Sequence, residues 1–331
     1  MQTATRTSRP SVLILGANGR LGCAAAQAFD AAGWQVLAQV RRDASPEMPA
    51  SARLVRASLS SPADIVAQAA GASVVVHAVN PIYTRWDQEA LPALEAGLQI
   101  AEQLGAHFML PGNVYNFGDS MPASLSEATP ARPSTRKGEL RVEMESLIAK
   151  RAAQGRLTAS VVRAGDFFGA GTGTYLDLVV VKSLAAGKLV YPGPLDVPHA
   201  WAYLPDLAQA FVRVASIEHP APFDTWHFEG HTLTGDEFLD ATEAALKDLG
   251  IELALRRGEL PWSLIRAGGL VLPMWRELAR MSYLWRVPHA LDGRRLASLG
   301  RQAHTPLREA LRASLRAMAL PGMVEPAVAA N

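Results

Sequence analysis

The sequence predicts an α/β protein built on a doubly wound parallel sheet, with a smaller C-terminal lobe interleaved with the sheet domain. Three observations predict this class. Short, wholly apolar segments alternate with helix-period segments through residues 11–165, as is typical of parallel strands covered on both faces. After about residue 166 this alternation gives way to turn-rich pieces between helical stretches. A glycine-rich turn directly follows the first strand.

The first strand is the apolar run at 11–16, and the segment after it places Leu21, Ala25, Ala28 and Phe29 on one side of a helix. Further strands are expected at 34–40, 52–58, 73–79, 106–110, 157–165 and 223–230. Further helices are expected from Pro62, within 87–104, and at 134–148, 205–216, 234–249 and 306–319. At 331 residues, 49% of them hydrophobic, the chain can bury a large core.

Composition limits the partners and the compartment. A net charge of +1 without a basic stripe predicts no nucleic-acid partner. The single cysteine, Cys23, excludes an internal disulfide framework and predicts a reducing, cytoplasmic location. The 8 histidines are scattered without ligand spacing, so no metal site is expected.

The longest apolar stretch, at 260–275, predicts a buried or groove-lining helix. It is too short to span a bilayer, contains Arg266 and is bounded by prolines, so no membrane partner is expected. The polar N-terminus predicts a disordered tail at residues 1–10.

The segment LILGANGRLG places Gly16, Gly19 and Gly22 where the first strand turns into the first helix. Gly16 permits a tight turn, Gly19 allows the backbone to approach a pyrophosphate, and Gly22 allows close packing of helix and strand. The free amides at the start of the helix face the anion. The turn therefore predicts a dinucleotide site.

The end of the second strand indicates which nicotinamide nucleotide binds. An acidic side chain at that place holds the ribose hydroxyls of NAD, whereas an arginine suits the 2′-phosphate of NADP. Here the strand ends in Val40, Arg41 and Arg42, with Asp43 only afterwards. Arg20, inside the glycine turn, also carries a charge suited to a phosphate. NADP is therefore expected, with NAD as the alternative.

The GxxGxxG spacing and four later segments, at 74–81, 110–118, 161–169 and 200–212, resemble the extended and atypical short-chain dehydrogenases/reductases, the NAD-dependent epimerase/dehydratase-like proteins. The resemblance implies a Rossmann-type domain at 11–166 that binds NAD(P). It also implies a mainly substrate-binding lobe at 167–331, with a segment at about 200–216 that returns to the Rossmann domain. By resemblance, the coenzyme contacts are Gly16, Asn18, Gly19, Arg20, Leu21, Arg41, Ser58, Leu59, Ala78, Val79, Asn80 and Gly165.

The family's chemistry uses a Tyr hydroxyl as acid and base, a Lys four residues later, and a Ser or Thr that polarises the substrate. Alignment by Pro133 and Glu143 places Thr135 at the Tyr position and Glu139 at the Lys position. Asn113 stands where the Ser or Thr is expected. The usual mechanism is therefore absent from this chain as it is written.

Several hypotheses remain. A displaced set can act, with Tyr115 as the proton donor, Lys137 near the ribose or substrate, and Asn113 as a hydrogen-bond donor to a carbonyl. Against it, Lys137 lies roughly 200° around the helix from Glu139. Catalysis can also rely on a well-positioned coenzyme, with water or substrate supplying the proton. A conventional epimerase or dehydratase with a misaligned motif is a further alternative, as is a protein that binds NADP(H) as a sensor without turnover.

Other side chains are candidates for the pocket that holds a small-molecule substrate. Asp166 lies in a segment that contacts substrate in the family, and His199 and Trp201 precede the helix at 205–216. His77, at the end of the fourth strand, is expected to be structural. The tryptophans near the C-terminus favour a ligand less polar than a sugar nucleotide. A monomer or homodimer is expected.

Overall fold

A wholly parallel seven-stranded sheet forms the centre of the protein in a computed structural model, which describes residues 9–219, 221–318 and 320. The strand order is β11-β7-β5-β4-β1-β2-β3. The strands are β1 (Ser11–Leu15), β2 (Gln35–Val40), β3 (Arg53–Arg56), β4 (Val74–His77), β5 (His107–Gly112), β7 (Ala159–Arg163) and β11 (Phe223–His227). This confirms the predicted α/β class and adds β11 to the large sheet.

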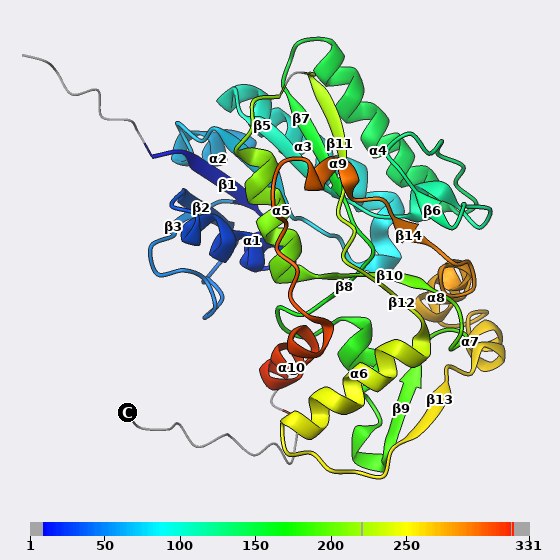
Figure 1. Ribbon diagram of the computed structural model, residues 1–331. Helices are drawn as coiled ribbons and strands as arrows, with labels where there is room; N and C mark the ends of the chain where they lie inside the picture. Colours follow the sequence, from blue (N-terminus) through cyan, green and yellow to red (C-terminus); the bar gives the residue numbers. More distant parts are fainter. Residues whose placement is uncertain (1–8, 220, 319, 321–331) are drawn as a thin grey trace, which may run out of the picture.

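Helices cover both faces of the sheet (Figure 1). One face carries α1 (Arg20–Ala31) and α5 (Leu204–Ala215), and the other carries α2 (Pro62–Gln68), α3 (Trp86–Leu104) and α4 (Arg136–Ala153). Successive residues of β1 supply the two cores in turn: Val12 and Ile14 pack toward α1, and Leu13 and Leu15 toward α3. Burial on both faces explains why the strands read as continuous apolar runs.

The strand order reverses beside β1, which pairs with β2 on one side and with β4 on the other. In open α/β sheets, ligands bind outside the carboxyl ends of the strands at such a switch point. The glycine turn of residues 16–22 leaves β1 at that end, so the fold places it where a ligand is expected.

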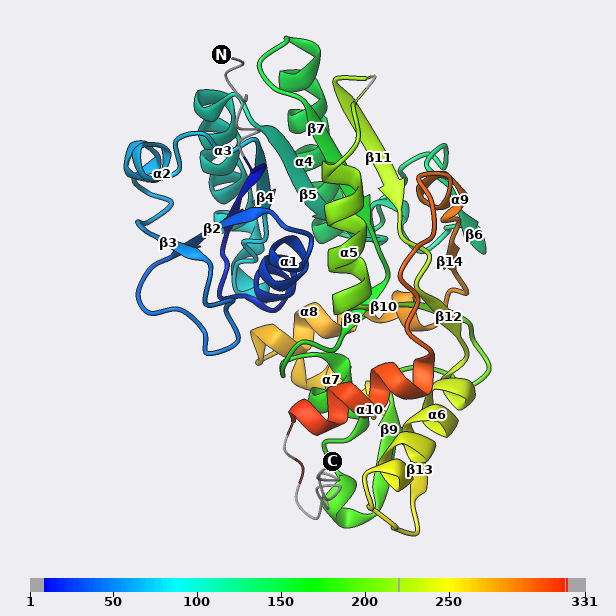
Figure 2. The same ribbon diagram turned by 60° about the vertical axis from the view of Figure 1, so that its left-hand side comes forward.

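The C-terminal lobe lies beyond the carboxyl edge of the sheet (Figure 2). Its three-stranded sheet has the order β12-β10-β8, with β8 (Asp166–Phe168), β10 (His199–Tyr203) and β12 (His231–Leu233). A second pair joins β9 (Lys188–Tyr191) to β13 (Arg256–Glu259), and a third joins β6 (Ser124–Leu125) to β14 (Ala290–Leu291). The remaining elements of the lobe are η3 (Leu176–Val180), η4 (Leu184–Ala186), α6 (Gly235–Asp248), α7 (Trp262–Gly268), α8 (Pro273–Met281), η5 (Ser282–Trp285) and α10 (Leu307–Ala317). The short helix α9 (Arg294–Ala297) packs against β11 of the large sheet.

An aromatic core holds this lobe together. The Trp201 ring on β10 stacks on that of Phe238 on α6, with centroids 4.4 Å apart, and both side chains are fully buried. Phe168 on β8 meets Phe238 edge-on at 6.1 Å. Trp201 thus packs in the core of the lobe.

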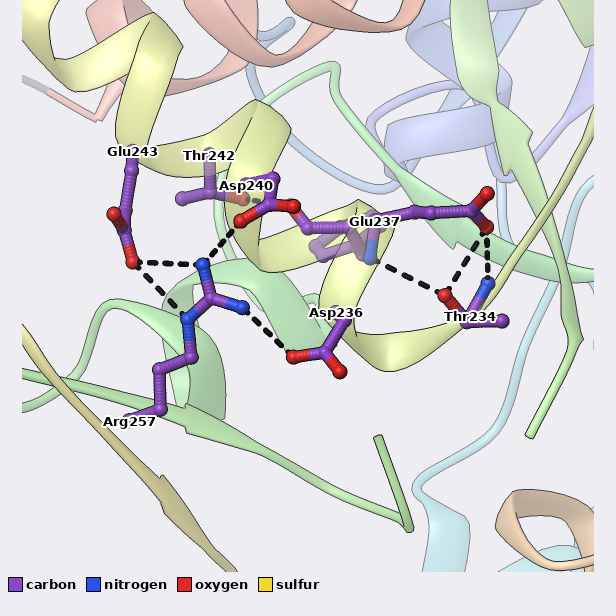
Figure 3. A network of polar contacts seen from close by, with 8 residues as sticks. Thr234, Asp236, Glu237, Asp240, Thr242, Glu243 and Arg257 are labelled. Atoms are coloured by element: carbon purple, nitrogen blue, oxygen red, sulfur yellow. Dashed lines mark hydrogen bonds and ion pairs between the residues drawn. The ribbon is translucent and has the colours of Figure 1, made fainter. Parts of the chain in front are cut away.

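Helix α6 is stabilised at both its start and its solvent side (Figure 3). Thr234 and Glu237 form a reciprocal capping box at its first turn. Arg257 on β13 donates to Asp236 at 2.7 Å, to Glu243 at 3.2 Å and to Asp240. One guanidinium therefore ties β13 to successive turns of α6.

The stretch at 260–275 is not the buried helix that its composition predicted. It forms α7, a turn and the start of α8, and most of its apolar side chains are exposed. Gly268 and Gly269 let α7 and α8 pack closely as a hairpin, because a Cβ on Gly268 would lie within 2.6 Å of the Trp275 ring and one on Gly269 would lie 3.0 Å from Arg276 Cα. None of the described helices combines the length and apolar character that crossing a bilayer demands.

The expected N-terminal tail falls largely on residues 1–8, which lie outside the described residues. Arg9 donates to the carbonyl of Gly33, and the carbonyl of Pro10 accepts a bond from the amide of Gln35 at 2.9 Å. The part of the tail that the structure describes is therefore joined to β2.

Candidate functional site

The glycine turn requires glycine for steric reasons at Gly16 and Gly22, whereas at Gly19 a side chain is tight but adoptable. Gly16 has φ +75°, in the left-handed region, and a Cβ there would meet Val79 at 3.1 Å. A Cβ on Gly22 would meet Ala17 Cα at 2.8 Å, and one on Gly19 would lie 3.2 Å from the Gly16 carbonyl oxygen. Because no side chains fill these positions, a bound group can approach the backbone of the turn closely.

The first amides of α1 have no acceptors within the helix. The earliest helical bond runs from the amide of Cys23 to the carbonyl of Gly19 at 2.7 Å, and no side chain caps the helix at Gly19. The N–H groups of Arg20, Leu21 and Gly22 thus precede the bonded part of the helix. Together with the helix dipole they favour an anion at this end.

Two hydrogen bonds on either side of Arg41 and Arg42 join the glycine turn to the end of β2 and to the loop after it. The amide of Ala17 donates to the Gln39 carbonyl at 3.2 Å, and the side chain of Asn18 donates to the Asp43 carbonyl at 2.8 Å. Arg41 and Arg42 lie between these attachments, and both are exposed. Neither arginine is ion-paired within the described residues.

Gln39 extends this arrangement to the next strand. Its side-chain oxygen accepts from the amide of Gly16 at 2.9 Å, and its nitrogen donates to the Ala57 carbonyl at 2.6 Å. Ser58 is exposed and Leu59 half-buried just after that point. The carboxyl ends of β1, β2 and β3 are thereby joined into one edge.

Arg20 extends from the start of α1 toward the loop before η3. Its Nη1 atom is buried without a hydrogen-bond partner among the described residues, and a Cβ on Gly173 would lie 3.8 Å from it. Burial lowers the pKa of the Arg20 guanidinium, while the charge of Asp177 raises it. A buried, unsatisfied guanidinium nitrogen suits an anionic ligand.

The remaining predicted coenzyme contacts divide into two groups. Ala78, Val79 and Asn80 follow β4 beside the turn, where Ala78 donates to the Leu15 carbonyl at 2.9 Å. Gly165 is different, because a Cβ on it would meet the Cβ of Ala200 at 2.8 Å. Close packing against β10 accounts for that glycine without any ligand.

The residues of helix α4 that face the interior differ from Thr135 and Glu139, the two positions that the alignment indicated. Thr135 is its N-cap and accepts from the amide of Gly138, and Glu139 is exposed beside Arg136. Lys137 is 5% exposed, and Arg141, one turn later, donates to the Pro111 carbonyl at 3.1 Å. The inward pair is therefore Lys137 and Arg141, with the four-residue spacing expected of the family's Tyr and Lys.

A buried ion pair confirms this phase of the helix. Glu145 lies 2.7 Å from Arg163 at the end of β7, and both side chains are largely buried. Glu143, the residue used for the alignment, is exposed. Counting back from Glu145 instead of Glu143 would have indicated Arg141, which the sequence analysis missed.

Lys137 is held by partners from two other elements. Its Nζ atom lies 2.8 Å from the carbonyl oxygen of Tyr83, in η1 (Tyr83–Arg85), and 2.9 Å from the carboxylate of Glu277 on α8. The same nitrogen sits 4.3 Å from the centroid of the Tyr83 ring. Glu277 therefore neutralises Lys137 in this conformation.

Tyr115 and Asn113 lie at the carboxyl end of β5. Tyr115 begins η2 (Tyr115–Phe117), and its amide donates to the Asn113 side-chain oxygen at 3.1 Å. Burial raises the pKa of the Tyr115 hydroxyl, the charge of Asp166 raises it further, and the charge of Arg141 opposes both. The hydroxyl consequently stays protonated across the physiological range.

Asp166 stands among aromatic side chains. Its carboxylate lies 2.9 Å from Nε2 of His199, whose ring stacks on Trp285 with centroids 4.2 Å apart. The charge of Asp166 raises the pKa of 5 of the 6 tyrosines, after burial as the first cause in each, namely Tyr83, Tyr115, Tyr175, Tyr191 and Tyr283. The charge of one carboxylate thus acts on phenols from five separate segments, which the sequence alone did not reveal.

His77 is fully enclosed at the end of β4. A Cβ on Gly97 of α3 would meet its Nδ1 atom at 2.5 Å, and its ring lies 5.8 Å from that of Phe108. Burial, followed by the charge of Arg141, lowers the pKa of His77 to about 4. This environment is that of a packed, neutral histidine. No group of three or more metal-ligating side chains occurs within the part of the chain that the structure describes.

The sequence of residues 12–223 matches the family model described as the NAD dependent epimerase/dehydratase family. The chain belongs to this family of enzymes. The match covers most of the chain and confirms the resemblance inferred from the glycine turn and the later segments. A search of curated protein sequences gave no match.

Several solved structures share the fold. The Bordetella bronchiseptica enzyme WbmH, in complex with NAD+, is 18% identical with a TM-score of 0.71, covering 95% of this chain and 100% of its own. MoeE5, in complex with UDP-glucuronic acid and NAD, is 20% identical with a TM-score of 0.70, covering 92% and 98%. L-threonine dehydrogenase from Clostridium difficile is 17% identical with a TM-score of 0.71, covering 96% and 99%.

The residues of this member of the family fit a nicotinamide dinucleotide. The three glycines leave the space that side chains would fill, and the unsatisfied Arg20 Nη1 supplies a positive group beside it. Gly16, Gly19 and the amides of Arg20 and Leu21 are the groups that would hold the diphosphate.

Proposed function

We propose that this enzyme is an NADP-dependent oxidoreductase or epimerase/dehydratase-like enzyme acting on a small molecule. The observation that carries the coenzyme preference is the position of Arg41 and Arg42, which lie between the two hydrogen bonds that join the glycine turn to the end of β2 and to the loop after it. No carboxylate occupies the end of β2, which ends at Val40. An exposed arginine there suits a 2′-phosphate, whereas NAD would lack a carboxylate partner for its ribose.

The bound coenzyme would supply hydride transfer, and the residues of this chain would handle the proton. Tyr115 is the proton donor in this proposal, because its hydroxyl is protonated at neutral pH and lies at the carboxyl edge of the sheet. Asn113, whose oxygen is bonded to the Tyr115 amide, keeps its amide nitrogen for a substrate carbonyl. A donor that stays protonated favours reduction of a carbonyl over oxidation of an alcohol.

Lys137 takes a different role from the one expected of a displaced catalytic lysine. It is bonded to Glu277 and to the Tyr83 carbonyl, so it positions η1 and α8 around the site. Arg141 supplies the positive charge near the Tyr115 hydroxyl instead. We assign Tyr115 and Asn113 to substrate contact, and Lys137 and Arg141 to positioning and electrostatics.

The substrate is proposed to be less polar than a sugar nucleotide. The side chains around Asp166 are mostly aromatic, including Tyr175, whose ring lies 4.7 Å from that of Trp285. A diphosphate would be repelled by the carboxylate of Asp166. A small carbonyl compound with an aromatic or aliphatic body suits these surroundings.

A second candidate is an NADP(H) sensor without turnover. The neutralisation of Lys137 by Glu277 and the lack of a tyrosine at the usual helix position favour it. Purified protein incubated with NADPH and a panel of aldehydes and ketones distinguishes the two. Turnover that falls at least about a hundredfold in Tyr115→Phe supports the oxidoreductase. Coenzyme binding with no turnover on any substrate supports the sensor.

The control variant for this experiment is Tyr203→Phe. Tyr203 lies on β10, and the charge of Asp166 does not contribute to its raised pKa. Equal activity in Tyr115→Phe and the unchanged protein would contradict the assignment of Tyr115. A cytoplasmic location, and a monomeric or homodimeric state, remain predictions.

A further inference from the structure

The α7–α8 hairpin carries most of the exposed apolar side chains of the described chain. Of the eight large hydrophobic residues that the described residues leave exposed, five lie between positions 264 and 274. These five are Leu264 (58% exposed), Leu270 (86%), Val271 (83%), Leu272 (46%) and Met274 (42%), and they are called the hairpin tip below. An apolar cluster of this kind on a protein surface marks an interaction site.

Contacts outside its tip hold the hairpin in place. Trp275 packs on Gly268 where the two helices meet, and Ile265 and Met281 are buried. At the base, Trp262 Nε1 donates to the Pro192 carbonyl at 2.7 Å, and Glu277 is bonded to Lys137 at 2.9 Å. The tip is thus presented on a fixed support, between the sheet domain and the C-terminal lobe in Figures 1 and 2.

The backbone of the tip needs no water to satisfy its amides. Leu270 donates to the Ala267 carbonyl at 3.3 Å, and Val271 and Leu272 donate to the Gly268 carbonyl at 3.0 and 2.8 Å. Pro273, which follows, has no amide hydrogen. Amides bonded in this way lower the cost of entering a poorly hydrated layer.

The exposed charges that the hairpin itself carries are all positive. Arg266, Arg276 and Arg280 are exposed on the two helices. The single acidic residue between positions 260 and 286 is Glu277, which is turned inward to Lys137 and also contacts Arg280. Apolar side chains beside exposed arginines match the acyl layer and the phosphates of a lipid surface, respectively.

We propose that the hairpin tip docks on the surface of an anionic lipid membrane. Leu270 and Val271 enter the boundary between headgroups and acyl chains, and Arg266 and Arg276 contact lipid phosphates. This peripheral contact requires no spanning helix, and it does not depend on the coenzyme or on the proposed chemistry. It revises the expectation of no membrane partner, which considered only whether the stretch could span a bilayer.

A second copy of the chain fits the tip less well. In a two-fold contact between identical hairpins, each patch faces its own copy, so the exposed arginines of one hairpin would approach those of the other. Like charges at an interface are unfavourable unless acidic groups separate them. The one acidic residue of the hairpin, Glu277, is already bonded to Lys137.

Co-sedimentation of the full-length protein with vesicles tests the proposal. The probes are vesicles of phosphatidylcholine alone and vesicles of equal parts phosphatidylcholine and phosphatidylglycerol. The protein is expected to sediment with the anionic vesicles, to bind the neutral ones at least about tenfold more weakly, and to be released from the anionic ones as salt is raised.

Two variants separate the apolar and the charged contributions. Leu270→Ser/Val271→Ser is expected to weaken binding to anionic vesicles at least about tenfold, because two apolar side chains no longer leave water. Arg266→Gln/Arg276→Gln is expected to weaken it by a similar factor. Leu253→Ser, an exposed apolar residue outside the hairpin, is the matched control and should bind as the unchanged protein does.

Thermal melts and NADPH titrations verify that each variant is folded, since the substituted side chains make no core contact. Absence of binding to either kind of vesicle would overturn the proposal, as would binding that the tip variant leaves unchanged or that is equal for neutral and anionic lipid. A dimer in sedimentation equilibrium that Leu270→Ser/Val271→Ser dissociates would assign the tip to a second copy instead, and would also overturn it.

Discussion

The ammonium group of Lys137 lies 2.9 Å from the carboxylate of Glu277, 140 positions later in the chain, and the two side chains are 6% and 15% exposed. This ion pair joins α4 of the sheet domain to the α7–α8 hairpin. It places a neutralised lysine where a free one was expected near the ribose or substrate, and it holds α8 beside η1.

Glu277→Gln is expected to lower the free energy of unfolding by about 3 kcal/mol, because it leaves a buried ammonium without a carboxylate. Urea unfolding measures the change. The matched control is Glu139→Gln on the exposed face of α4, where the pair with Arg136 should contribute less than about 1 kcal/mol. The double variant Lys137→Met/Glu277→Met should recover much of the loss. A loss of stability in the double variant equal to the summed losses of Lys137→Met and Glu277→Met would show that the two residues do not interact.

Arg41→Ala is expected to weaken NADPH binding by about tenfold to a hundredfold, because a charged hydrogen bond to a phosphate is lost. NADH lacks that phosphate and serves as the internal control, so its affinity should change little. Arg42→Ala shows whether the neighbouring arginine shares the contact. Equal weakening for both coenzymes in Arg41→Ala would contradict the NADP assignment.

Stability is expected to fall as the pH is lowered from neutrality, in part through His77. Burial holds the pKa of His77 at about 4 in the folded protein, below its ordinary value of 6.5. Between these pH values the unfolded chain binds the proton more readily than the folded protein does. The stability that depends on a neutral His77 is therefore fully present above pH 6.5 and is lost as the pH falls toward 4.

For His77 alone this amounts to about 2 kcal/mol between roughly pH 7 and pH 5, measured by urea unfolding at each pH. The variant His77→Leu should lose less stability over the same interval, by about that amount. His289, whose pKa burial also lowers to about 4, contributes a separate share that both proteins retain. Parallel pH profiles for the two proteins would contradict a buried neutral His77.

The sheet domain could be predicted because its signals are local. Strands buried on both faces, such as β1 with all five residues buried, must be apolar throughout, so each is visible without knowledge of its neighbours. The glycine turn was visible for a similar reason, because the steric limits at Gly16 and Gly22 arise within a few residues of the chain.

The phase of α4 could not be predicted in the same way. Leu140 and Met144 show which side of the helix is apolar, but the choice between Glu143 and Glu145 depends on Arg163, which lies on β7. The ion pair between Glu145 and Arg163 forms only in the folded protein, so the sequence of the helix alone does not reveal it. An error of two residues then moved the inward positions from Lys137 and Arg141 to Thr135 and Glu139.

The C-terminal lobe was predicted least well, since its strands pair across long separations. Trp201 on β10 is paired with Asp166 on one side and with His231 on the other. The prediction for the hairpin at 260–275 was wrong for a different reason. Apolar composition normally predicts burial, and the stretch was therefore expected to be buried. Gly268 and Gly269 let the two helices pack closely there, and the apolar residues around the turn remain on the surface.

The measurement that tests the central claim most directly is a calorimetric titration of NADPH and NADH into the unchanged protein and into Gly19→Asp. Gly19 has φ −72° and ψ 160°, which aspartate adopts readily, and an aspartate N-cap stabilises a helix while filling its anion site with its own carboxylate. We expect the unchanged protein to bind NADPH more tightly than NADH, and the folded variant to bind neither. Failure of the unchanged protein to bind either coenzyme, or undiminished binding by a folded Gly19→Asp, would contradict the account.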